Sequence, residues 1–263
     1  MSSVVAKKTT QVIAVSNRKG GAGKTTVAVN LAAELAALGK HVLLIDLDSQ
    51  GHCAVGLGLR HVAGDASVHD LFRGQPRGVL DSIKNTQVER LDIAPADQMF
   101  DHGGASQDHA SLARALDDED LRSRYEYIII DTPPSLDSLL LNALTAADWV
   151  LIPYIPQALS LEGVKQLMRV LFKLISAQSS HLRILGFLPI QVHGQVRSHR
   201  KVTGEIARQF GSLRLLGGIR SDVRLAESFA AGQPIRLFGP KCRAAEDFVG
   251  LARHLLDIMN KEA

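Results

Sequence analysis

Short runs of apolar residues alternate along the chain with stretches in which apolar residues recur at helical spacing. Several runs are nearly continuous in valine, isoleucine and leucine, which is typical of strands that are covered on both faces. The predicted strands are 9–17, 41–48, 90–96, 125–133, 149–155, 183–192 and 213–218. The predicted helices are 25–39, 111–121, 138–147, 160–177, 200–211 and 244–259, and the polar segment 61–81 is expected to be loop and short helix. This alternation predicts an α/β fold with a doubly wound, mainly parallel sheet flanked by helices.

The 263-residue chain is long enough to bury a substantial core, and we find no repeat, low-complexity segment or linker in it. We therefore expect one domain over 11–263 behind a short flexible tail at 1–10. No apolar run approaches the roughly 20 residues that cross a bilayer, and the first ten residues lack the apolar core of a secretory signal. Cys53 and Cys242 stand alone, without the spacing of a metal cluster or a disulfide framework. These features indicate a cytoplasmic protein.

A glycine-rich loop, KGGAGKTT, joins the first predicted strand to the first predicted helix. Its glycines let backbone N–H groups surround a polyphosphate, Lys24 can reach the β- and γ-phosphates, and the Thr25 hydroxyl can ligate Mg²⁺. Arg18 stands where the usual P-loop pattern has its first glycine. The sequence still predicts an ATP site, formed by Lys19, Gly20, Gly21, Ala22, Gly23, Lys24, Thr25 and Thr26.

Three aspartates close two of the predicted strands. Asp46 and Asp48 end the strand 41–48, and Asp131 ends the strand 125–133. Ligands of open α/β sheets bind beyond the carboxyl ends of the strands, so these side chains should converge on the phosphate loop. Alternation along a strand should place Asp46 and Asp48 on the same side.

The loop KGGAGKTT resembles the deviant Walker A motif of the ParA/MinD family of P-loop ATPases, in which an additional lysine occupies the position of Lys19. The resemblance implies an ATP-dependent sandwich homodimer in which Lys19 contacts the ATP held by the partner subunit. The segment IDLDSQG is similar to the family's second motif, VDxDPQG, with Ser49 replacing proline, and implies that Asp48 positions the attacking water. Asp131 corresponds to the Walker B aspartate that holds Mg²⁺ together with Thr25. The implied enzyme is a Mg²⁺-dependent ATPase with Lys19, Lys24 and Asp48 as catalytic residues.

Basic residues are concentrated in the carboxyl-terminal third. Residues 181–263 contain 13 Lys+Arg against 7 Asp+Glu, whereas residues 1–180 contain 17 against 20. A basic surface of this kind neutralises phosphates without reading bases, although charge alone is also compatible with a solvated basic face. The segment 219–248 resembles the family segment that contributes both to the adenine pocket and to nonspecific DNA binding, with Arg220 and Ser221 where Pro-Arg is common. The predicted nonspecific DNA contacts are Arg197, Arg200, Lys201, Arg220, Arg224, Lys241 and Arg243.

The resemblance is greatest to small ParA/Soj partition proteins. It implies a nucleoid-associated ATPase that positions or segregates a plasmid, a chromosome origin or a protein assembly, with hydrolysis stimulated by a ParB-like adaptor. One alternative is a MinD-like membrane-associated regulator, which needs an amphipathic tail that we do not expect after the last predicted helix. The other is a metabolic enzyme on the same fold, which needs substrate-binding residues or paired cluster cysteines.

Overall fold

A seven-stranded sheet lies at the centre of the computed structural model, which describes residues 10–60, 64–75, 77–101, 103, 106–176, 181–194 and 196–262. The strand order is β3-β4-β2-β5-β1-β6-β7, and every pair is parallel except β3 with β4. The predicted doubly wound, mainly parallel sheet is thereby confirmed, while the tail expected at 1–10 lies outside the described residues except for Thr10. The strands are β1 (Gln11–Val15), β2 (Val42–Asp46), β3 (Lys84–Asn85), β4 (Leu91–Ala94), β5 (Tyr127–Asp131), β6 (Trp149–Tyr154) and β7 (Arg183–Pro189).

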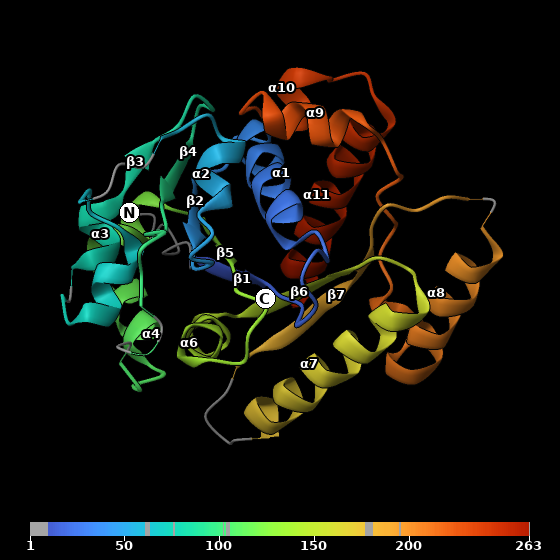
Figure 1. Cartoon of the computed structure of the whole chain (residues 1–263), viewed down its shortest axis with the longest axis horizontal. Coiled ribbons are helices and arrows are strands. Elements are labelled where there is room, and N and C mark those ends of the chain that lie inside the picture. The colour runs from blue at the N-terminus through green and yellow to red at the C-terminus, as the bar shows by residue number, and fades with distance from the viewer. Residues whose placement is uncertain are drawn as a thin grey trace, which may run out of the picture.

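Helices cover both faces of the sheet (Figure 1). Alternating strand residues point to opposite layers: Ile129 packs with one set of helices, whereas Ile128 and Ile130 pack with the other. The first layer contains α1 (Lys24–Ala37), α2 (His52–Gly56), α9 (Arg224–Ala230), α10 (Ile235–Phe238) and α11 (Arg243–Glu262). The second contains the 3₁₀ helix η1 (Val68–Arg73), α3 (Gly78–Ser82), α4 (Ser111–Leu116), α5 (Glu119–Arg124), α6 (Ser138–Ala146), α7 (Ala158–Ser176) and α8 (Arg197–Phe210).

The central strand β1 positions the phosphate loop. It lies between β5 and β6, and the chain leaves its carboxyl end to enter α1. Since β2, β5 and β1 are parallel neighbours, their carboxyl ends meet at one edge of the sheet beside that loop. No helix within the described ranges combines the length and the apolar content that a membrane crossing requires.

Three local predictions differ from the structure. The strand expected at 213–218 is absent from this described segment: Ser212–Arg214 is a 3₁₀ helix (η3), and a single bridge joins Leu215 to Phe187. The helix expected at 111–121 is divided into α4 and α5, because the Asp118 carboxylate accepts backbone N–H bonds and caps a new helix. The short elements α2, β3, α9 and α10 were not predicted, because two to seven residues are too few to show a periodic pattern.

Candidate nucleotide and metal site

The phosphate loop begins α1 in the geometry that its glycines permit. Gly21 and Gly23 have φ values of 71° and 76°, in the left-handed region that side chains with a Cβ rarely adopt. Gly23 is also the N-cap of α1, and a Cβ added there would lie 2.1 Å from the Ile190 Cδ1 atom. The loop therefore presents backbone N–H groups at a helix N-terminus, which is an anion-binding arrangement.

A pocket of about 780 Å³ opens above this loop, and Gly20 to Thr26 line it. The Lys24 side chain is almost completely buried there. Burial lowers the pKa of its ammonium group, and the carboxylates of Asp131 and Asp48 counter part of that shift. A bound phosphate would supply the negative charge that this buried cation needs.

The pocket also has an apolar wall that suits a planar ligand group. The wall is formed by Ile190, Ile219, Leu225 and Phe229, and the side-chain amide of Gln191 also lines the pocket. These residues fit a purine ring, whose edge an amide can recognise by hydrogen bonding. The resemblance implied the segment 219–248 for an adenine pocket without naming residues, and Ile219, Leu225 and Phe229 lie in that segment. The sequence did not indicate Ile190 and Gln191, which come more than 160 positions after the phosphate loop.

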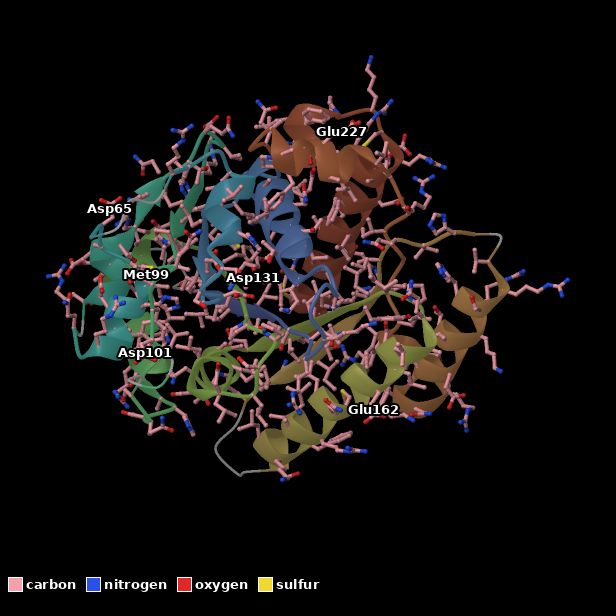
Figure 2. All side chains as sticks on the ribbon, in the orientation of Figure 1. Asp65, Met99, Asp101, Asp131, Glu162 and Glu227 are labelled. Carbon is pink, nitrogen blue, oxygen red and sulfur yellow. The ribbon has the colours of Figure 1, made fainter. Side chains whose placement is uncertain are left out.

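Two buried carboxylates lie side by side beneath the phosphate loop. Asp46 and Asp131 are register partners on β2 and β5, and both are fully buried; Figure 2 shows Asp131 in the interior, near the start of α1. The Asp131 Oδ2 atom accepts hydrogen bonds from the Thr25 hydroxyl at 2.6 Å and from the Cys53 thiol at 3.4 Å. Burial is the main cause that raises the pKa of Asp131 to about 6, while the Thr25 hydrogen bond and the Lys24 charge oppose the rise.

Asp46 is the more strongly perturbed of the two carboxyl groups. It accepts backbone N–H bonds from Cys53 at 2.9 Å and from Asp48 at 3.1 Å. Burial, followed by the charge of Asp131, raises its pKa well above the ordinary value. Asp46 therefore organises the turn that carries Asp48, a role that only the three-dimensional register reveals.

The oxygen atoms around Thr25 fit Mg²⁺. Asp131 Oδ1 is buried and has no hydrogen-bond partner among the described residues, although its other oxygen has two. A buried carboxylate oxygen without a hydrogen-bond partner, next to a threonine hydroxyl, matches the hard oxygen ligands that Mg²⁺ prefers. Thr25 and Asp131 are thus the residues that would hold the ion and its water.

Asp48 and Lys19, which were both predicted to be catalytic, differ in their placement. Asp48 lies just beyond β2 and lines the pocket, and its carboxylate accepts the Gln50 N–H at 3.1 Å. Lys19 lies outside the pocket lining: its Nζ donates to the Ser160 hydroxyl on α7 at 3.3 Å, and its backbone N–H donates to Asn17. Asp48 can therefore reach a ligand of its own subunit, whereas Lys19 faces away from it.

The predicted DNA contacts occupy three separate elements. Arg197, Arg200 and Lys201 are exposed on α8, Arg224 is exposed on α9, and Lys241 and Arg243 are exposed around the start of α11. Arg220 differs, because its guanidinium group binds the carboxylates of Asp247 at 2.8 Å and Glu246 at 3.1 Å. Its charge is already neutralised within the chain, so it is the least available of the seven.

Comparisons with known proteins agree with this geometry. A family model described as an AAA domain matches residues 10–184. The chain is 38% identical over 252 residues to the sporulation initiation inhibitor protein Soj of Bacillus subtilis, covering 93% of this chain and 98% of that protein. It is 34% identical over 251 residues to the chromosome partitioning protein ParA of Caulobacter vibrioides, covering 94% of each.

Solved structures extend the likeness to nucleotide complexes. Cobyrinic acid a,c-diamide synthase from Mycobacterium smegmatis, with bound ADP and magnesium, matches with a TM-score of 0.78 and 28% identity over 97% of both chains. The septum site-determining protein MinD from Pyrococcus horikoshii, complexed with Mg-ADP, matches with a TM-score of 0.78 and 26% identity over 97% of this chain and 99% of that one. With its phosphate loop, buried lysine and paired strand-end aspartates, the chain belongs to the ParA/Soj family of partition ATPases and is a P-loop ATPase that uses ATP and Mg²⁺.

Proposed function

We propose that the protein is an ATP-switched homodimer that binds DNA without sequence preference and positions or segregates cargo over the nucleoid. The cargo is a plasmid, a chromosome origin or a protein assembly, and a ParB-like adaptor stimulates hydrolysis. This places the working protein in the cytoplasm, associated with the nucleoid. The observation that carries the proposal is Lys19, a cation that belongs to the phosphate loop and lies outside its own pocket.

Exposed apolar side chains at the carboxyl edge of the sheet support a dimer. Met99, Leu136 and Leu159 follow the ends of β4, β5 and β6, and they are 80%, 46% and 79% exposed. Val223, which lines the rim of the pocket, is 71% exposed. Apolar residues gathered around a ligand site in this way are typical of a surface that a partner covers. A second copy joined at this edge would bring its Lys19 to the bound phosphates.

In this proposal each residue of the site has a separate role in hydrolysis. Lys24 and the loop N–H groups hold the phosphates, and Thr25 with Asp131 hold Mg²⁺, which neutralises charge that develops during transfer. Asp48 orients water for in-line attack on the γ-phosphate. Lys19 of the partner subunit supplies the additional positive charge, so hydrolysis is slow until the dimer forms.

The exposed basic residues of α8, α9 and α11 support DNA binding. Six of the seven predicted contacts are exposed, and no ion pair within the described residues occupies their side chains. Such cations release counterions from DNA when they bind phosphates, so affinity should fall steeply with salt concentration. ATP would control binding because the dimer joins two such basic surfaces.

The test uses the Asp48→Ala variant, in which hydrolysis is blocked and the ATP state persists. Fluorescence anisotropy with two unrelated DNA duplexes should show binding with ATP, none with ADP, and a linear loss of log affinity with log salt. Arg224→Glu should abolish binding and leave ATP-dependent dimerisation intact. Arg77→Glu is the matched control, because Arg77 is exposed beside α3, away from the basic elements, and should have little effect. Equal binding with ADP, or vesicle binding without DNA binding, would contradict the proposal, and the second result would favour the MinD-like alternative.

A further inference from the structure

A buried histidine outside the pocket contacts the loop that carries Asp48. His69, on η1, is fully buried, and its imidazole lies between Asp97 and Leu47. The Asp97 backbone N–H lies 3.1 Å from His69 Nδ1, and the Asp97 carbonyl oxygen lies 3.3 Å from the same nitrogen. The shorter contact, in which Nδ1 accepts, assigns the ring proton to Nε2. His69 Nε2 then donates to the Leu47 carbonyl oxygen at 3.3 Å.

This second hydrogen bond acts on the peptide unit that precedes Asp48. The carbonyl of Leu47 and the N–H of Asp48 belong to the same planar group, which rotates as one body. Its oxygen is held by His69, and its N–H donates to the Asp46 carboxylate at 3.1 Å. The orientation of the Asp48 Cα, and with it the reach of the Asp48 carboxylate, is therefore fixed from both sides.

The imidazole is itself held in one orientation. It stacks on the Phe100 ring with centroids 4.2 Å apart and an interplanar angle of 21°. The Arg73 guanidinium lies over the Phe100 ring, with its central carbon 5.2 Å from the ring centroid. It also donates a hydrogen bond to the Asp97 carboxylate at 2.5 Å. Stacking on one face and hydrogen bonds at both nitrogens together fix the position of the His69 ring.

A second contact holds the same turn from the segment that follows β4. The Gln98 side-chain amide donates to the Gln50 carbonyl oxygen at 3.1 Å, on the far side of Asp48. His69 of η1 and Gln98 thus bind the turn after β2 on the two sides of Asp48.

We propose that His69 is a positioning residue for ATP hydrolysis, which acts by fixing the Leu47–Asp48 peptide and so aims the Asp48 carboxylate at the attacking water. The inference rests on the proposed role of Asp48. It concerns a side chain that contacts neither nucleotide nor metal, so its loss should change the chemical step and leave binding unchanged. Misplacing a catalytic group by about 1 Å costs on the order of a hundredfold in rate.

The experiment compares steady-state ATPase activity, at saturating DNA, of the wild type with two variants. His69→Phe keeps the aromatic packing on Phe100 and removes both hydrogen bonds, and it should lower kcat roughly tenfold to a hundredfold with KM for ATP within about twofold. His69→Gln retains one donor and one acceptor and should recover part of the lost kcat. Nucleotide affinity, measured with a fluorescent ATP analogue, should be the same in all three proteins.

Two results would overturn the inference: an unchanged kcat in His69→Phe, or equal losses of kcat and nucleotide affinity in both variants, which would indicate a purely structural role. Asp48→Ala, assayed in parallel, distinguishes a failure of the role proposed for His69 from a failure of the role proposed for Asp48. If Asp48→Ala hydrolyses ATP normally, the proposed role of Asp48 fails. If Asp48→Ala is inactive and His69→Phe is not impaired, only the role of His69 fails.

Discussion

Replacing Asp131 by asparagine should stabilise the nucleotide-free protein while it destroys the enzyme. Asp131 is fully buried, and one of its oxygens has no hydrogen-bond partner among the described residues. Asparagine has the same shape, and its carbonyl oxygen can still accept from Thr25 and Cys53. The substitution therefore removes a buried charge and keeps most of the contacts.

The pKa of Asp131 sets the size of the effect. A rise from 3.8 to about 6 means that the folded protein binds this proton more tightly than the unfolded chain does. The stability contributed by the protonated carboxyl is complete below pH 4 and is lost as pH rises through 6. One pKa unit corresponds to about 1.4 kcal/mol, so ionisation of Asp131 lowers the free energy of unfolding of the wild type by about 3 kcal/mol at pH 7. Asp131→Asn cannot ionise and does not lose this stability.

Urea denaturation of both proteins at pH 4.5 and pH 7, without nucleotide, measures this difference. Asp131→Asn should be more stable at pH 7, and its advantage should shrink at the lower pH. Added Mg²⁺ and ATP should stabilise the wild type by mass action, and should stabilise the variant less because it lacks one of the two residues that would hold Mg²⁺. Glu162→Gln, on the exposed face of α7 (Figure 2), is the control and should stay within about 0.5 kcal/mol of the wild type. The reasoning would be refuted if the variant were less stable than the wild type at pH 7. It would also be refuted if the stability difference between the two proteins were the same at both pH values.

Two further substitutions test the packing around α1. Gly23→Ala should lower ATP affinity at least tenfold in equilibrium binding, because its Cβ would lie 2.1 Å from Ile190 Cδ1 at a φ of 76°. Gly20→Ala, which meets no atom within 4 Å, is the control, and equal losses in the two variants would contradict the steric argument. Arg236→Ala should cost about 3 kcal/mol in urea denaturation, because it leaves the buried Glu34 carboxylate without the guanidinium that now lies 2.5 Å away. Full stability in that variant would show that Glu34 does not need its partner.

The sequence predicted the parts of the site that depend on local order. The glycine spacing of 19–26 and the apolar runs that end at Asp46 and Asp131 were sufficient to predict that the phosphate loop and these aspartates lie at one edge of the sheet. The reason is that parallel strands have their carboxyl ends at the same edge. The strand expected at 213–218 failed because a short apolar run does not distinguish a paired strand from a segment that forms one bridge.

The remaining features depend on register and on long-range contacts. That Asp46 lies directly beside Asp131, and not merely near it, follows from the pairing of β2 with β5. That His69 reaches Leu47 depends on how η1 packs under the turn after β2, and its sequence neighbours carry no sign of that contact. The apolar wall of the pocket likewise combines residues that follow β7 with residues of α9, two elements separated by a long connection.

The central claim is that Lys19 acts across a dimer interface, and sedimentation velocity tests it most directly. The Asp48→Ala protein should sediment as a dimer with Mg²⁺ and ATP and as a monomer with ADP. The same protein carrying Lys19→Ala should bind ATP and remain a monomer. Dimers of equal abundance in ATP and ADP, or unimpaired dimerisation without Lys19, would contradict the account.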